Sequence, residues 1–197
     1  MSSSDAMFAS MDLVAHDPTT NAKGQKSALI FRNGGASCLW RIPGETRPLF
    51  DPSPYKGDGM NETSRLSLCL GASEEALAEA KSLDEWAVEY ALSHSEAFFG
   101  KTLSREAVVD RYSAPVLKTS EKYAACIRIK VVLEGRGLPN YWTETKERRD
   151  APVVWQNSTI TANVRIIGFW FMNNSFGLTL QLADAMVVEG PGAACPF

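Results

Sequence analysis

Residues that commonly bind structural metals are scarce in this 197-residue sequence, which contains four cysteines and two histidines. The cysteines, Cys38, Cys69, Cys126 and Cys195, lie far apart and form no Cys-x-x-Cys pair. A structural zinc site needs clustered cysteine or histidine ligands. The sequence therefore predicts no metal site, and nothing in it calls for another cofactor.

The sequence also lacks the segments that direct a chain into or across a membrane. No run of 18 apolar residues is present, so no membrane-spanning helix is expected. Residues 1–6 are polar and lack the apolar core of a signal peptide. We therefore expect an intracellular protein of the nucleus or cytoplasm, with reduced cysteines and no membrane partner.

The motifs of several enzyme classes are missing as well. There is no G-x-S-x-G, no Walker P-loop, no H-E-x-x-H and no G-x-G-x-x-G. Two histidines also leave few groups for general acid–base chemistry near neutral pH. We expect a protein that binds rather than catalyses, although a carboxylate-based enzyme stays an alternative.

Charge is distributed unevenly along a chain whose net charge is −3. Residues 71–100 carry seven acidic residues and one basic residue, whereas residues 101–170 carry twelve basic and seven acidic residues. Such a difference between segments says more about partners than the total does. The second stretch is a candidate for binding a polyanion, and a set of solvated charges is the alternative.

The first half of the chain alternates between extended and loop-like sequence. Residues 1–22 predict a loose arm, and residues 43–60, with four prolines and three glycines, predict a loop. Residues 27–33 and 37–42 predict a hairpin, because Asn33-Gly34-Gly35 between them is a turn sequence. Residues 65–70 predict another short strand.

The middle of the chain predicts an acidic helical insertion over about residues 73–112. Ser73 is a good N-cap, and Glu74 and Glu75 place negative charge in the first turn. Ser82-Leu-Asp-Glu85 is a second capping box, which predicts a new helix start.

The second half predicts mainly strands. Residues 123–134, 159–172 and 176–189 are expected in one antiparallel sheet, with a tight turn at Asn173-Asn174. Residues 136–151 predict a polar loop, and residues 152–155 a short strand.

These elements predict an α+β fold, a small antiparallel β-barrel of the OB type with a helical insertion. We expect one domain over residues 23–190 and a short tail over residues 191–197. A β-sandwich is the structural alternative.

Aromatic and basic residues are interleaved in this chain, as sequence-tolerant binding of single-stranded nucleic acid requires. Trp40, Trp142 and Trp170 are candidates for stacking on bases, and Arg128, Lys130, Arg148, Arg149 and Arg165 for contacting phosphates. Arg41 and Lys146 complete the candidate set, while core packing is the favoured role for Phe169 and Phe171.

Residues 168–188, Gly-Phe-Trp-Phe-Met-Asn-Asn-Ser-Phe-Gly-Leu-Thr-Leu-Gln-Leu-Ala-Asp-Ala-Met-Val-Val, carry a resemblance to a known family. A Trp-x-Met strand end, a polar turn, a Phe-Gly start and an apolar strand containing Gln are similar to the last hairpin of single-stranded-DNA-binding proteins of large nucleocytoplasmic DNA viruses. Those proteins resemble the OB-fold single-strand binders of podophages. The resemblance implies a viral DNA-binding protein acting in DNA replication or recombination at the viral replication site.

The chain ends in Pro196-Phe197. Bacterial and podophage single-strand binders similarly end in an aromatic residue that recruits replication proteins, so the resemblance implies partner binding by Phe197. The acidic tail of those families is missing, since only Glu189 precedes the final Gly-Pro-Gly-Ala-Ala-Cys segment.

Two functions follow as alternatives. The first is sequence-tolerant binding of single-stranded DNA, with RNA as an alternative ligand and a homo-oligomer as an open alternative to a monomer. The second is a β-barrel structural or scaffold protein, such as a viral minor capsid component.

Overall fold

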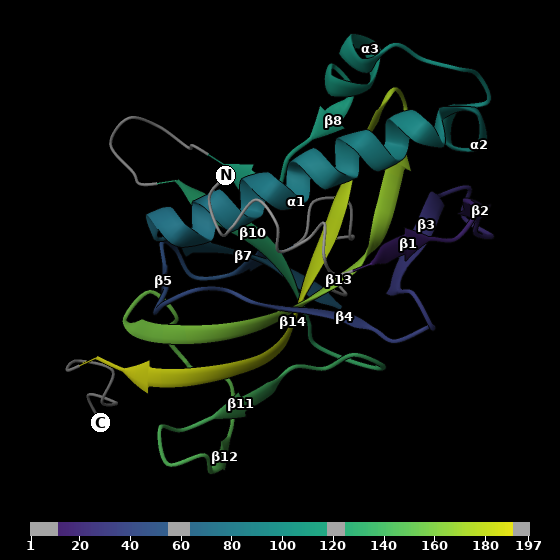
Figure 1. Ribbon diagram of the computed structural model, residues 1–197. Coiled ribbons are helices and arrows are strands. Elements are labelled where there is room, and N and C mark those ends of the chain that lie inside the picture. Colours follow the sequence, from purple (N-terminus) through teal and green to yellow (C-terminus); the bar gives the residue numbers. More distant parts are fainter. Residues whose placement is uncertain (1–11, 55–63, 118–124, 191–197) are drawn as a thin grey trace. The chain divides into compact units, whose positions relative to one another are not determined.

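The computed structural model describes residues 12–54, 64–117 and 125–190 (Figure 1). These residues are mostly β-sheet with few helices, and none of the described helices is long and apolar enough to cross a membrane. They form two compact units, and the single domain expected over residues 23–190 stays a prediction. The first unit contains residues 12–38, 78–115 and 166–179; the second contains the remaining described residues.

The N-terminal strands belong to the first unit. β1 (Leu13–Ala15) and β2 (Thr19–Thr20) both pair antiparallel with β3 (Lys26–Arg32). β3 in turn pairs antiparallel with residues 168–171. From residue 12 onward the N-terminal segment is therefore not the loose arm that its polar sequence predicts, because its backbone groups bond to β3.

The helical segment expected over residues 73–112 is confirmed. α1 (Glu74–Ser93) is followed by α2 (Ser95–Phe99) and α3 (Arg105–Val109). Ser73 caps α1, since its Oγ accepts a hydrogen bond from the Ala76 N–H at 3.2 Å. The expected restart at Ser82 is wrong: Ser82 is buried inside the continuous α1.

Aromatic rings from α1 and α2 form the core of the first unit together with Phe169 of β13. The rings of Trp86, Tyr90 and Phe98 lie 5.8, 6.1 and 5.2 Å from the ring of Phe169, measured between centroids. Phe169 is 1% exposed, which confirms its expected place in the core. This packing anchors the helices on the sheet of the first unit.

Two long strands dominate the C-terminal part of the chain. β13 (Ser158–Met172) and β14 (Ser175–Glu189) are joined by the expected turn at Asn173-Asn174, where Asn173 has a φ of 54°. Asparagine tolerates this left-handed backbone conformation better than most residues do. The start of β14 pairs parallel with β8 (Tyr112–Ser113) in the first unit.

The second unit contains the shorter strands. β10 (Cys126–Val132) pairs antiparallel with β7 (Arg65–Gly71) over seven residues. The other strands are β4 (Cys38–Arg41), β5 (Arg47–Pro48), β6 (Ser53–Pro54), β9 (Val116–Leu117), β11 (Asn140–Trp142) and β12 (Arg148–Arg149). β5 and β6 pair with β7, and β9 pairs with β10.

Two predictions of strand pairing need correction. β10 pairs parallel with β14 through Lys130 and Gln181, not antiparallel, because the two strands are not consecutive and no hairpin sets their direction. β3 and β4 are not paired with each other in the described residues; each pairs with β13. The turn between them is present, with the Gly35 N–H bonded to the Arg32 carbonyl oxygen.

The segment after β10 also differs from the sequence prediction. Residues 136–151, expected as a loop, contain the β11–β12 hairpin. Residues 152–155, expected as a strand, are irregular, and the Trp155 N–H donates to the carboxylate of Asp51 at 2.7 Å instead of to a neighbouring strand.

The named strands do not close into a ring among the residues that the structure describes. Their order ends at β5 on one side. Next to β5, however, Thr46 forms an isolated antiparallel bridge with Ile160 of β13, with N–O distances of 2.8 and 2.7 Å. A barrel therefore stays a prediction.

Candidate functional site

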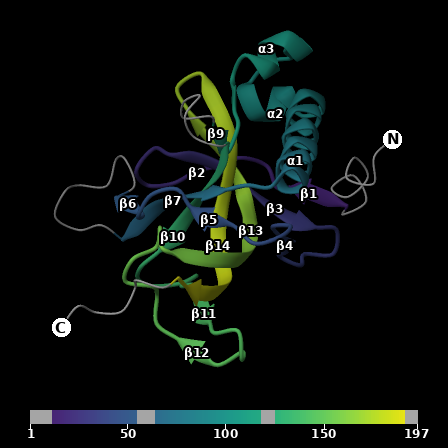
Figure 2. The same cartoon turned by 90° about the vertical axis from the view of Figure 1, so that its left-hand side faces the viewer.

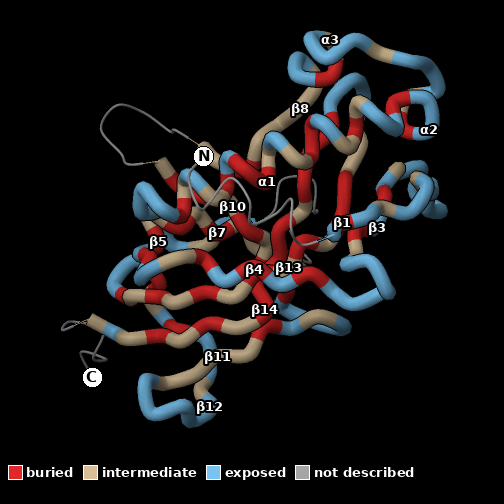
Figure 3. Tube along the Cα trace, in the orientation of Figure 1, coloured by how far each residue is buried: buried red, intermediate tan, exposed pale blue. Residues whose placement is uncertain are grey.

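One sheet face of the second unit is polar, and strand alternation explains why. Along β13, the half-buried Thr161 and Asn163 alternate with the buried Ala162 and Val164 (Figure 3). Side chains of successive strand residues point to opposite faces. The same alternation exposes Arg41 on β4, the neighbour of β13.

β14 and the β11–β12 hairpin extend this face. Asn140 and Trp142 of β11 pair with Asp184 and Met186 of β14, respectively. Trp142 also pairs with Arg148 across the hairpin. The hairpin thus lies beside the C-terminal part of β14, as both views of the ribbon show (Figures 1 and 2).

These elements line a pocket of about 370 Å³ in the second unit, and the pocket is open to solvent. It is lined by Arg41, Trp142, Thr143, Lys146, Thr161, Asn163, Asp184 and Met186. Three of these residues, Arg41, Trp142 and Lys146, are among the binding residues that the sequence predicts, and the fold brings them together from distant segments.

A chain of polar contacts fixes the hairpin side of the pocket. The Arg148 guanidinium donates to Asn140 Oδ1, and Asn140 Nδ2 donates to Asp184 Oδ1 at 2.8 Å. The guanidinium carbon of Arg148 also lies 5.8 Å from the centroid of the Trp142 ring, a cation–π distance. Trp142 and Asp184 are therefore held by the same arginine, one of them through Asn140.

Two cations of the pocket have no side-chain partner among the described residues. Arg41 and Lys146 form no ion pair and no side-chain hydrogen bond with residues 12–54, 64–117 or 125–190. Lys146 lies in the β11–β12 turn with a φ of 63°, and its N–H donates to the Thr143 carbonyl oxygen at 3.0 Å. Both charges are exposed and available to an external anion.

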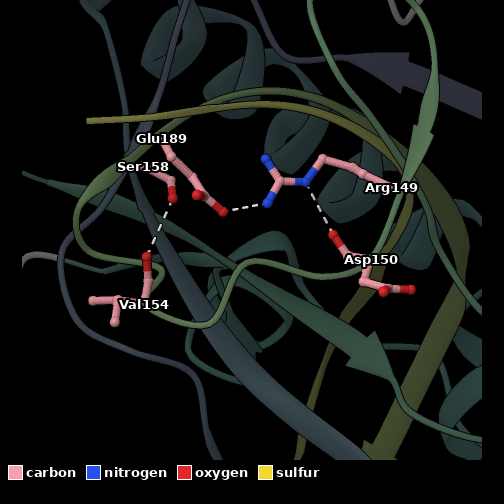
Figure 4. Close-up of polar contacts among 5 residues, drawn as sticks. All are labelled: Arg149, Asp150, Val154, Ser158 and Glu189. Carbon is pink, nitrogen blue, oxygen red and sulfur yellow. Dashed lines mark hydrogen bonds and ion pairs between the residues drawn. The ribbon is translucent and has the colours of Figure 1, made fainter. Parts of the chain in front are cut away.

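Arg149 points away from this pocket. Arg149 is paired with Tyr141 across the β11–β12 hairpin. Its guanidinium forms an ion pair with Glu189, and its Nε–H donates to the Asp150 carbonyl oxygen (Figure 4). Tyr141 packs edge-to-face against the buried Trp155, and burial raises the pKa of Tyr141 to about 12. The sequence assigns the same role to Arg148 and Arg149, but the structure places them on opposite faces of the hairpin.

The other predicted residues lie elsewhere. Trp40 is 0% exposed, so its ring belongs to the core and is not accessible to a base. Arg128 and Lys130 on β10 and Arg165 on β13 are half-buried and do not line the pocket. In the first unit, the half-buried Trp170 ring lies close to Gly177. Phe197 is outside the described residues.

The sequence does not predict four other residues of the pocket. Thr161, Asn163, Asp184 and Met186 belong to strands whose dominant sequence pattern is apolar. Asp184 could have been noticed, because it is the only charged residue between Ser175 and Val188. Its partner Asn140 lies 44 positions away, so their contact depends on the β11–β14 pairing.

No family model matches this chain, and a search of curated proteins found no match. A structure of the single-stranded DNA-binding protein from bacteriophage Enc34 in complex with single-stranded DNA is similar to this chain, with 12% identity and a TM-score of 0.48. The similarity covers 87% of this chain and 94% of that one.

A second structure of the Enc34 protein shows 11% identity and a TM-score of 0.46, covering 94% of this chain and 95% of that one. Both structures are of a bacteriophage protein, so the resemblance to large nucleocytoplasmic DNA viruses stays a prediction.

Proposed function

We propose that this protein binds single-stranded DNA through the pocket of its second unit, without catalysis and with little dependence on sequence. The observation that carries the proposal is the meeting of one aromatic ring, Trp142, with the unpaired cations Arg41 and Lys146 around one open pocket. Single-strand binding needs these two parts together, a flat ring for bases and positive charge for the backbone.

The cation–π contact gives each face of the Trp142 ring a role. The Arg148 guanidinium lies over one face of the ring, and a base stacks on the other. Arg148 then adds positive charge at the edge of the pocket while limiting the freedom of the ring. Because the ring is held before binding, less conformational freedom is lost when the base stacks.

We further propose that the second unit is an OB-like barrel. The Thr46–Ile160 bridge supports this, because it links the segment beside β5 to β13 and so joins the two ends of the path β13-β14-β10-β7-β5. Strands and loops of an OB barrel form its usual oligonucleotide-binding surface. Coating of single strands in replication or recombination is the cellular role that such binding would serve.

Titration with oligo-dT tests the proposal. At low salt we expect quenching of tryptophan fluorescence, because Trp142 stacks on a base, and an affinity that falls as salt rises. Trp142→Phe should lose most of the quenching while it still binds, which assigns the signal to this ring. Absence of salt-dependent binding by the wild type would overturn the proposal and favour the structural or scaffold alternative.

A further inference from the structure

Asp184 is an unexpected residue in a pocket for a polyanion. Its carboxylate lines the pocket with Trp142, and a negative charge there repels phosphate. A residue that only opposes binding would be better replaced by a neutral one. Its position next to the ring proposed to stack on a base indicates a contact with the base instead.

The carboxylate is held in one orientation. Asp184 Oδ1 accepts from Asn140 Nδ2 at 2.8 Å, and Arg148 in turn donates to Asn140 Oδ1. Asp184 Oδ2 accepts no hydrogen bond from any residue that the structure describes. One acceptor oxygen is therefore fixed by the protein, and the other is available to a ligand donor.

Hydrogen-bonding chemistry selects among bases at such an oxygen. A carboxylate accepts from the exocyclic amino group of cytosine, whereas the corresponding position of thymine or uracil is a carbonyl oxygen. A carbonyl oxygen facing the carboxylate would repel it. A carboxylate left facing that carbonyl oxygen, with no donor at this position of the base, also loses the hydration that it had in the free protein.

We propose that Asp184 makes this pocket selective for bases with an exocyclic amino group, with cytosine preferred over uracil and thymine. The inference rests on the proposed function and adds a base preference at one position within otherwise sequence-tolerant binding. Asn163 also lines the pocket, and its side-chain amide forms no hydrogen bond with the residues that the structure describes, so it is placed to assist in the same contact.

Oligo-dC and oligo-dU form the sharpest test, because cytosine and uracil have rings of the same size and neither carries a methyl group. At pH 7.5 we expect the wild type to bind oligo-dC about tenfold more tightly, which corresponds to about 1.4 kcal/mol. The salt dependence should be equal for the two ligands, because the preference comes from the base and not from phosphate contacts.

Asp184→Asn tests the residue itself. Its amide keeps an acceptor for Asn140 and offers a donor in place of the free carboxylate oxygen, so the preference should disappear or reverse towards oligo-dU. Glu144→Gln is the matched control, because Glu144 is an exposed neighbour of Thr143 that does not line the pocket. It removes the same charge and should leave the oligo-dC to oligo-dU ratio unchanged.

Each outcome separates this inference from the proposed function. Equal affinity of the wild type for both ligands, with salt-dependent binding intact, overturns the base preference and leaves single-strand binding in place. A preference that Asp184→Asn does not alter also overturns the role of Asp184. If the wild type binds neither oligo-dC nor oligo-dU, the proposed function itself is overturned.

Discussion

At the scale of single residues, two neighbouring residues of the same type on one strand can have different environments. Arg148 and Arg149 are consecutive, yet one lies over Trp142 and the other pairs with Glu189. The sequence shows two equivalent arginines in a polar segment. Only the assignment of that segment to a strand separates them, because alternation then places them on opposite faces.

Substitution of these two arginines should give different results. Arg148→Ala is expected to weaken oligo-dT binding and to reduce the slope of log affinity against log salt by about 0.7, the value for one lost contact with a single strand. Arg149→Ala should leave the slope unchanged, because its charge is already paired with Glu189. Affinity measured across a salt series checks both variants, and equal slopes would contradict a phosphate contact by Arg148.

Trp142 should behave in the opposite way to Arg148. Trp142→Ala is expected to weaken oligo-dT binding by about 1–3 kcal/mol while the salt slope stays nearly constant, since stacking involves no phosphate. Trp40→Phe serves as a contrast, because Trp40 is fully buried and its ring cannot reach a base. The same salt series provides the measurement, and unchanged affinity in Trp142→Ala would place the stacking surface elsewhere.

At the scale of elements, a buried polar contact joins α1 to β8 inside the first unit. The Tyr112 hydroxyl donates to Asp84 Oδ1 at 2.6 Å. Burial raises the pKa of Asp84 to about 6 from 3.8, although the hydrogen bond from Tyr112 opposes this shift. The folded protein therefore holds a proton on Asp84 at pH values where the unfolded chain has lost it.

This difference in proton binding predicts a pH-dependent stability. Between about pH 4 and pH 6 the folded state binds more protons than the unfolded state, so the free energy of unfolding should fall as pH rises through this window. Asp84→Asn removes the ionisation and should be more stable than the wild type above pH 7, by at most about 3 kcal/mol.

Urea denaturation at a series of pH values measures the effect. The stability gained by Asp84→Asn should shrink towards pH 4, because the Asp84 carboxyl group of the folded wild type is then protonated and uncharged, like the asparagine amide. Tyr112→Phe should widen the pH window, because it removes the hydrogen bond that favours the ionised carboxylate. A constant difference between Asp84→Asn and the wild type at every pH would show that Asp84 does not titrate in this way.

Elements that depend on a few consecutive residues can be predicted from the sequence, whereas strand pairings between segments far apart in the chain cannot. The Ser73 cap and the Asn173-Asn174 turn depend on a few consecutive residues and occur where expected. The partner of β4 and the direction of β10 against β14 depend on segments far apart in the chain. The sequence does not predict the β11–β12 hairpin, because its two strands are only three and two residues long.

At the scale of the whole molecule, the same limit applies to the candidate site. Arg41, Trp142 and Lys146 could be selected by residue type, because cations and aromatic rings suit a nucleic acid. Asp184 stands out in the sequence as a lone charge, but its place in the pocket, like that of Asn163, depends on β13 and β14 presenting both residues to the same pocket. Trp40 met the same residue-type criterion but is buried, since alternation along β4 turns it inward and Arg41 outward.

The two compact units are also interleaved along the chain, each being built from three separate segments. β13 and β14 each contribute residues to both units, with the divisions falling after Arg165 and after Thr179. In genetic terms, no single cut in the coding sequence separates one unit from the other. Neither unit can be exchanged or inherited as a contiguous module, so recombination between related genes would have to transfer both together.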